Sequence, residues 1–452
     1  MGNNFTVTVP KVAPKPRTWE GFRMKIYPVL PIIFLLCGAI TPSPAQNVPD
    51  AQGGHGSGAF ATGRYRNLFV ESGHSQVKTQ EKIAAAFRQL FHGDPQNEAV
   101  YFPAGANSNG PLAYICDVSH DDVRSEGMSY GMMIAVQLDK RTEFDALWNW
   151  ARTWMYHDSP DHPSYGFFSW SMRTTGAPND EMAAPDGEEY FVTALYFADG
   201  RWGSGQGIYN YRTEAARLLA DMRHRQYITG QTVNGIRTAG ALFDAEHRMV
   251  RFTPNQKNGN RTDPSYHLPA FYELWAKWGP PADRDFWKQA AATSRDFFQR
   301  ATDPVTGLAP EYANFDGSPR ASPRSAESVD FGFDAWRTAM NWSVDWAWWR
   351  ADPREQALSD RLQGFFESKG ISTYGSQFRL DGSQFGDNHS TGLVAMNAVA
   401  SLAATQPRAR RFVEALWHEP VPTGQWRYYD GMLYLLGMLH CGGEFRIWGP
   451  GG

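Results

Sequence analysis

Apolar side chains recur at three- and four-residue spacing along nearly the whole chain after residue 65, and this spacing is the strongest constraint on the fold. Residues spaced in this way share one face of a helix, which must be buried against another element. The alternation typical of a strand is scarce, and Met249–Phe252 is its best instance. Helices are expected around three early apolar stripes and in a series of later stretches: Val77, Ile83, Phe87, Leu90 and Phe91; Met128, Met132, Ala135 and Val136; Phe144, Leu147, Trp148, Ala151 and Met155; then 187–198, 211–224, 267–278, 283–300, 333–350, 355–368, 391–404, 407–417 and 426–440.

Short connections between these helices predict that neighbours in sequence are antiparallel neighbours in space. Gly279–Pro281 and Asp352–Pro353 are examples in a set of about twelve helices. Such helical hairpins build either an open solenoid or a closed ring with an inner and an outer layer. A solenoid repeats its sequence at a fixed period, and no such period is found. We therefore expect an all-α fold, an (α/α)6 toroid of six helical hairpins with minor short strands in its loops.

The first 45 residues have the features of an export signal. Val29–Ile40 is an apolar run that follows Arg23 and Lys25, and it is shorter than the about 20 residues that span a bilayer. Ser43 and Ala45 form a small-x-small cleavage signature. We expect a signal peptide cleaved after Ala45 and a mature protein that is periplasmic or secreted and not bound to the membrane. The alternative is a retained N-terminal anchor.

Three further expectations concern the organisation of the chain. Met24 is a conventional start for such a signal, so translation is expected to begin there. The glycine-rich stretch within residues 46–64 predicts a flexible lead-in. Residues 65–452 contain no linker composition and are expected to form a single domain. The sequence leaves the oligomeric state open.

Composition excludes several classes of protein. With 43 Lys+Arg against 47 Asp+Glu, the net charge of −4 lacks the basic surface of a nucleic-acid-binding protein. Aromatic residues make up 14% of the chain, which excludes a disordered polypeptide and requires an explanation. Cys116 and Cys441, which follow the signal, could form one disulfide, although their spacing cannot show contact. The spacing of cysteine and histidine does not suggest zinc, so we expect no metal and no cofactor.

Acidic residues open several of the expected helices. Glu126 lies in the first turn of one, Asp186 opens another within Pro185–Tyr190, and Asp334 begins the aromatic run to Trp349. An acidic residue at a helix start also complements the helix dipole, which is the simplest explanation for each one alone. Arg337 follows Asp334 by three residues on the same helix face, as in an ordinary salt bridge.

The glycines beside Glu126 favour a less ordinary explanation. Gly127 and Gly131 each cost about 1 kcal/mol in a helix relative to alanine, a cost better tolerated where something packs closely. Carboxylates at helix starts of one ring could converge at its mouth, and nearby aromatics offer flat faces for sugar rings. A carboxyl pair that flanks a glycosidic bond is what hydrolysis needs. The aromatics divide into expected core residues (Phe144, Trp148, Phe286, Phe297) and candidates for the sugar-binding cleft (Trp170, Tyr266, Trp336).

Four segments together resemble glycoside hydrolase family 8: Asp122–Met133, Ala184–Phe191, Asp263–Pro269 and Phe333–Arg337. The resemblance implies an (α/α)6 toroid and hydrolysis with inversion, which requires carboxyl groups about 6.5–9.5 Å apart. It also implies a role for each matching residue: Glu126 as general acid, Asp334 as general base, Asp186 as the carboxylate that binds and distorts the sugar, Tyr266 as a ligand of the attacking water, Arg337 as the neighbour of the base and Trp170 as a stacking platform.

Within that family, the stretches Glu126–Trp202 and Gly307–Tyr312 look like the branch that releases xylose from the reducing end of β-1,4-xylo-oligosaccharides. A loop histidine in that branch contacts the reducing-end sugar, and His389 matches it. The match is incomplete, because serine follows His389 where the branch has proline. An endo-acting β-1,4-xylanase or endoglucanase of the same family is the alternative. Outside the family, the alternatives are a non-catalytic carbohydrate-binding protein, a structural toroid and an enzyme that cleaves by elimination.

Overall fold

The computed structural model describes residues 57–322 and 325–450. The expected signal peptide and its start at Met24 lie outside these residues, as does most of the expected lead-in. The last part of that lead-in contains α1 (Ala59–Thr62), a single turn that packs against α10. None of the helices in the described residues is long and apolar enough to cross a membrane.

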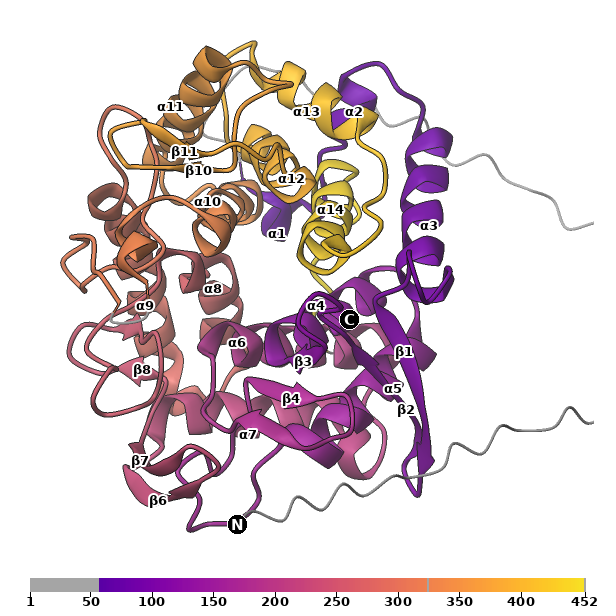
Figure 1. Cartoon of the computed structure of the whole chain (residues 1–452), viewed down its shortest axis with the longest axis vertical. Helices are drawn as coiled ribbons and strands as arrows, with labels where there is room; N and C mark the ends of the chain where they lie inside the picture. Colours follow the sequence, from indigo (N-terminus) through magenta and orange to yellow (C-terminus); the bar gives the residue numbers. More distant parts are fainter. Residues whose placement is uncertain (1–56, 323–324, 451–452) are drawn as a thin grey trace, which may run out of the picture. The chain divides into compact units, whose positions relative to one another are not determined.

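Twelve of the described helices form two concentric layers (Figure 1). The inner layer comprises α4 (Ser125–Gln137), α6 (Pro185–Trp202), α8 (Pro269–Trp278), α10 (Trp336–Trp349), α12 (Thr391–Val399) and α14 (Arg427–Cys441). The outer layer comprises α3 (Gln76–His92), α5 (Arg141–Trp150), α7 (Tyr211–His224), α9 (Arg284–Ala301), α11 (Arg354–Lys369) and α13 (Ala409–His418). Since α14 packs against both α3 and α4, the ring is closed, and the expected (α/α)6 toroid is confirmed.

Burial distinguishes the two layers. The inner helices α4 and α12 are buried on nearly every side, as expected of helices that have neighbours all around them. The outer helix α13 buries only Phe412, Val413 and Leu416, which lie on one face. The expected core aromatics Phe144, Trp148 and Phe297 are fully buried, and Phe286 is partly buried and packs against Phe243 and Trp287 of the core.

The predicted burial of one residue in the first stripe, Val77, was wrong. Val77 is 62% exposed, whereas Ile83, Phe87, Leu90 and Phe91 are buried as expected. Thr79 takes the inner position at the start of α3, because it precedes Ile83 by four residues and so lies on the same face. Val77, two residues earlier, faces solvent. The third stripe is correct, but its helix continues from α5 into a π-helical turn, η1 (Ala151–Met155).

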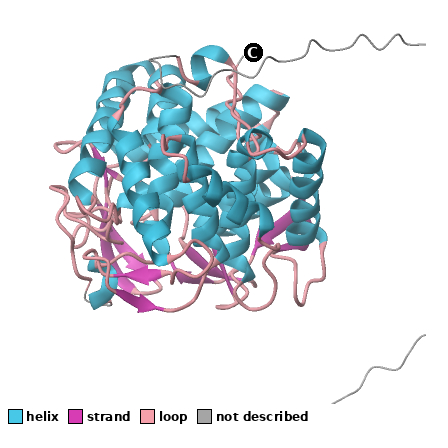
Figure 2. Ribbon diagram, turned by 90° about the horizontal axis from the view of Figure 1, so that it is seen from above, coloured by secondary structure: helices cyan, strands magenta, loops and turns pink. Residues whose placement is uncertain are grey.

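Short antiparallel strands lie mostly at one end of the helices (Figure 2). The prediction at Met249–Phe252 is partly confirmed by β9. The hairpin of β1 and β2 was missed, since Pro103, Gly105 and a shift of register interrupt its alternation. The strands are β1 (Tyr101–Asn107) with β2 (Gly110–Ile115), β3 (Asp122–Arg124) with β4 (Ser171–Arg173) and β5 (Pro178–Asp180), β6 (Ile228–Thr232) with β7 (Gly235–Ala239), β8 (Phe243–Asp244) with β9 (Met249–Val250), and β10 (Gln377–Phe378) with β11 (Gln384–Gly386).

Side chains fill the centre of the ring. A void of about 10 Å³ remains between residues such as Tyr190, Phe271 and Met340, which is about the smallest space that can hold a water molecule. The C-terminal segment closes the end where the inner helices finish, because Phe445 stacks on Trp348. Access to the inner helices is therefore from the end where they begin.

The two cysteines do not pair. Cys116 and Cys441 are both free and buried, so the disulfide that the sequence left open is not formed. Burial raises the pKa of the Cys116 thiol to about 12, with further contributions from neighbouring aspartates. This thiol stays protonated and unreactive at neutral pH.

Two helical glycines test how tightly the layers pack. A Cβ on Gly437 would lie 2.8 Å from the Cβ of Ala395 on the neighbouring inner helix, whereas one on Gly364 would meet only the movable end of Arg408. We expect Gly437→Ala to lower the free energy of unfolding by about 1–3 kcal/mol through overpacking. The matched variant Gly364→Ala should gain up to about 1 kcal/mol from helix propensity. Urea denaturation measures both, and equal effects would contradict the close approach.

Candidate active site

The inner helices all begin at the same end of the ring, because each is followed by an antiparallel outer helix. Glu126 and Asp186 lie in the first turns of α4 and α6. Asp334 lies in η6 (Phe333–Ala335), directly before α10, and Tyr266 lies in η3 (Pro264–Tyr266), before α8. The positive ends of the helix dipoles favour carboxylates at these positions. Residues far apart in the sequence are thus brought to one place.

Arg337 binds all three of the predicted carboxylates. Its Nη1 lies 2.8 Å from Glu126 Oε2 and 2.9 Å from Asp186 Oδ2, and its Nη2 lies 2.8 Å from Asp334 Oδ1. The arginine side chain is only 1% exposed. The salt bridge predicted between Asp334 and Arg337 is therefore present, but it belongs to a buried cluster and not to a solvated helix face.

Glu126 has a second partner that the sequence did not reveal. The hydroxyl of Tyr428 donates to Glu126 Oε1 at 2.8 Å, while Arg337 holds Oε2. Burial, opposed by Arg337 and assisted by the charges of Asp186 and Asp334, raises the pKa of Glu126 to about 7. A protonated Glu126 is therefore available near neutral pH.

The close packing expected at Gly127 is confirmed. A Cβ at this position would lie 2.7 Å from the ring and hydroxyl of Tyr428. Any larger residue would therefore displace the tyrosine that binds Glu126. The glycine costs helix stability but allows α14 to approach the start of α4.

Asp186 and Asp334 differ in their exposure. Asp186 accepts the N–H of Gly187 at Oδ1, 2.9 Å away, and its side chain is 6% exposed. Burial raises the pKa of Asp186, and Arg337 opposes that shift. The side chain of Asp334 is 31% exposed and is the most open of the three. Solvent or a ligand can therefore reach Asp334 most easily.

Tyr266 lies beside the arginine. Its ring stacks on Phe252 with centroids 6.0 Å apart, and the Arg337 guanidinium lies 5.8 Å from its centre. The Tyr266 hydroxyl has no hydrogen-bond partner among the described residues, which leaves it free to bind a ligand. The preceding turn is held by Asp263, which accepts the N–H of Ser265 at 2.7 Å.

The last two predicted site residues, Trp170 and His389, differ in their position relative to the carboxylates. The carbonyl of Trp170 accepts the N–H of Ser125, and its ring lies 5.9 Å from the guanidinium of Arg124, so it is close to the start of α4. His389 lies on the loop before α12, where its Nδ1 is 2.8 Å from the carbonyl of Tyr374. Within the part of the chain that the structure describes, His389 makes no hydrogen bond or ion pair with the three carboxylates.

Three further residues complete the cluster: Tyr130 and Ser265, whose oxygens accept from Arg337 at 2.7 and 3.1 Å, and Tyr428. Tyr130 follows Glu126 by four residues, and this spacing places both side chains on one helix face. The sequence could therefore have predicted that Tyr130 lies in the cluster. Ser265 lies inside the segment Asp263–Pro269 but carried no signal of its own. Tyr428 meets Glu126 only through closure of the ring.

A cavity of about 490 Å³ lies to one side of the cluster. Phe102, Tyr114, Asp121 and Arg427 are among its lining residues, and the three carboxylates are not. The guanidinium of Arg427 is already occupied by backbone carbonyls, including that of Ala99 at 2.9 Å. The cavity therefore offers space, but the chemistry lies with the carboxylates.

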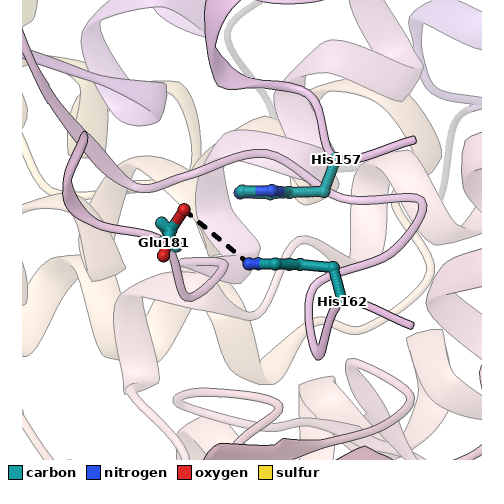
Figure 3. Close-up of side chains that lie close together, drawn as sticks. All are labelled: His157, His162 and Glu181. Carbon is teal, nitrogen blue, oxygen red and sulfur yellow. Dashed lines mark ion pairs between the residues drawn. The ribbon is translucent and has the colours of Figure 1, made fainter. Parts of the chain in front are cut away.

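His157, His162 and Glu181 place potential metal ligands within 4.8 Å of one another (Figure 3). The two imidazole rings are stacked, with centroids 3.9 Å apart and planes 4° from parallel. Each nitrogen lone pair lies in its own ring plane, so one ion cannot lie in both planes. Nδ1 of His162 also accepts the N–H of Ser164, whereas a metal-bound histidine donates from its second nitrogen. This arrangement does not fit a metal site.

A closed helical ring that holds buried carboxyl groups around one arginine, with Tyr266 and Trp170 beside them, has the parts of a glycoside hydrolase. The comparison with known families agrees. The chain belongs to glycosyl hydrolases family 8, whose model matches residues 107–443.

Relatives of the chain act on xylan fragments or glucans. The reducing-end xylose-releasing exo-oligoxylanase Rex8A of Paenibacillus barcinonensis is 41% identical over 87% of this chain and 99% of its own. A family 8 enzyme from Teredinibacter turnerae, solved with xylobiose, is 57% identical over 86% of this chain and 100% of its own, with a TM-score of 0.86. Endoglucanase A of Acetivibrio thermocellus is more distant, at 27% identity over 72% of this chain and 62% of its own.

Replacing Arg337 tests how far the cluster depends on it. Arg337→Met leaves buried carboxylates without their cation, so we expect the free energy of unfolding at pH 7 to fall by about 3–5 kcal/mol. The deficit should shrink as the pH falls, because the uncompensated carboxyls have raised pKa values and become neutral by binding protons.

The matched control is Arg411→Met, which removes an exposed ion pair with Glu367 (63% and 30% exposed) and should cost at most about 1 kcal/mol. Denaturant unfolding at pH 7 and pH 5 measures both variants. A loss for Arg337→Met that is no larger than the control's would contradict the role given to the arginine.

Proposed function

We propose that this glycoside hydrolase releases xylose from the reducing end of β-1,4-xylo-oligosaccharides by a single displacement with inversion. The observation that carries the proposal is the buried cluster in which one arginine holds Glu126, Asp186 and Asp334. Its relatives with the same family fold include reducing-end xylose-releasing exo-oligoxylanases, of which Rex8A is one. A neutral oligosaccharide also agrees with the small net charge.

Glu126 is the general acid. Its side chain is buried enough to keep a proton near neutral pH, and the Tyr428 hydroxyl and Arg337 fix both of its oxygens. It donates its proton to the glycosidic oxygen as the bond to the leaving sugar breaks. Arg337 then stabilises the carboxylate that remains.

Asp334 is the general base. It is the most exposed of the three carboxylates, so water can reach it, and it accepts a hydrogen bond from Arg337. It takes a proton from the water that attacks the anomeric carbon on the face opposite the leaving group, so the product has the inverted configuration. The unpartnered Tyr266 hydroxyl is available to bind that water.

Asp186 and Trp170 bind the substrate. The carboxylate of Asp186 is held by Arg337 and Gly187 and binds the hydroxyls of the sugar that is distorted at the cleavage point. Trp170 offers a flat ring beside the start of α4 for a neighbouring sugar. His389, on its loop beside Tyr374, contacts the reducing-end sugar.

A second candidate is endo-acting hydrolysis of xylan. The observation in its favour is the 57% identity to the Teredinibacter turnerae enzyme, which was also solved as a catalytic mutant xylanase with xylohexaose. In addition, Ser390 follows His389 in place of the proline of the exo-acting branch. Both candidates share the same cluster and the same mechanism.

The proposed place of action is outside the cytoplasm. The apolar run Val29–Ile40 and the cleavage signature at Ala45 support export by a signal peptide. Polymeric xylan and its fragments are found outside the cell that degrades them, which suits a periplasmic or secreted enzyme.

The pKa of Glu126 predicts the alkaline side of the pH profile. The acid must be protonated to donate, and the protonated fraction falls as the pH rises through about 7. We therefore expect kcat/KM for xylotriose to fall at least tenfold per pH unit well above pH 7. Initial rates from pH 5 to pH 9 measure this, and a constant kcat/KM up to pH 9 would rule out Glu126 as the acid.

The order in which products form tests the choice between exo and endo action. With xylotetraose labelled at the reducing end, exo action should release labelled xylose first, together with unlabelled xylotriose. Endo action should give labelled xylobiose early. NMR of the first products should show the α-anomer at the new reducing end.

The control for this experiment is Asp334→Asn, which should cut turnover by at least about a hundredfold while leaving the unfolding transition in place. Products made equally fast by this variant would come from a contaminant or from another mechanism. A β-anomer in the first products would contradict the inverting mechanism.

A further inference from the structure

We propose that Glu311 is an additional substrate-binding residue of this site, whose carboxylic acid donates a hydrogen bond to a hydroxyl of the sugar beside Asp334. The inference rests on the proposed function, since it concerns the same oligosaccharide.

The backbone places Glu311 between two segments of the site. Its N–H donates to the carbonyl of Asp330 at 3.0 Å, on the segment that leads to Asp334. Two residues later, Ala313 pairs with Thr262, on the segment that leads to Asp263 and Tyr266. Glu311 is therefore fixed at the junction of both segments.

The side chain of Glu311 lies against Gly332, two residues before Asp334. A Cβ on Gly332 would lie 2.8 Å from Glu311 Oε1. Gly332 has an extended backbone, with φ −165° and ψ 176°, which any residue can adopt. The absence of a side chain at position 332 thus leaves room for the carboxyl group of Glu311 beside the segment that carries Asp334.

The carboxyl group of Glu311 has no internal partner. It makes no hydrogen bond to any described residue, although its side chain is half-buried. Other buried acids of the ring differ from it: Glu188 accepts the N–H of Phe168, and Glu189 accepts the hydroxyl of Tyr272. Those two contacts lie inside the protein. The carboxyl group of Glu311 can therefore form hydrogen bonds with a bound ligand.

Burial and the surrounding charges favour the protonated form of Glu311. Burial first, then the negative charges of Asp334, Glu327 and Asp330 against the opposing charge of Arg337, raise its pKa to about 8. At pH 6–7 the group is therefore a neutral acid that can both donate and accept. Sugar hydroxyls need both kinds of partner.

Three variants test the proposal in the intact protein. Glu311→Ala removes the contact and should lower kcat/KM for xylotetraose at pH 6 about tenfold. Glu311→Gln keeps a donor and an acceptor and should lose about threefold at most. Gly332→Ala should push the carboxyl group away and lose activity in the wild-type background, but add little loss to Glu311→Ala, because the two changes remove the same contact.

Two readouts separate binding from a merely structural role. Calorimetry with xylotetraose, in the inactive Asp334→Asn background, should show about tenfold weaker binding when Glu311→Ala is added. On the alkaline side, log(kcat/KM) should show an extra drop of about one unit in the wild type, from ionisation of Glu311, beyond the decline that Glu126 causes, and this extra drop should be absent in Glu311→Gln.

Unchanged binding together with the same pH profile in the wild type and Glu311→Gln would overturn the inference, even if Glu311→Ala is less active. So would independent, additive losses from Gly332→Ala and Glu311→Ala. Failure of the proposed function is a distinct result, because the wild-type protein would then not release labelled xylose as the first product of xylotetraose labelled at the reducing end.

Discussion

The guanidinium group of Arg337 is the contact on which the whole site depends. It is almost completely buried and binds Glu126, Asp186 and Asp334 at once. Burial of several carboxylates without a cation would be too costly, whereas one cation does not neutralise them all. Burial, together with the negative charge that remains, keeps the pKa of Glu126 near 7. The same arginine thus stabilises the cluster and allows one of its members to stay protonated.

The ring explains why this cluster can form. Its inner helices begin at one end, so their first turns bring together residues that are hundreds of positions apart, such as Glu126 and Tyr428. The other end is closed by the C-terminal segment, in which Phe445 stacks on Trp348. The packed centre of the ring holds the first turns of the inner helices in place. The loops at the end where these helices begin carry Trp170 and Glu311.

The sequence correctly predicted the features of the fold and the site that follow from patterns within a short stretch of chain. Acidic residues at helix starts identified Glu126, Asp186 and Asp334, and the helical spacing identified the two-layered ring. It could not predict Tyr428, because nothing near that residue indicates which helix closes the ring. Ser265 was missed for a similar reason, since an isolated serine has no pattern. Val77 was placed on the wrong face because it precedes Ile83 by six residues, a spacing that does not bring two side chains to the same helix face.

Closure of the ring also determines when the site is completed during folding. The first and last parts of the described chain meet: the N–H of Ile447 donates to the hydroxyl of Tyr65 at 2.9 Å, and α14 supplies the tyrosine that binds Glu126. Contacts across such sequence separations form slowly, since a long loop must first be closed. A chain emerging from the ribosome would carry Glu126 for most of its synthesis without Tyr428. The acid therefore acquires its final environment only when the last helix docks.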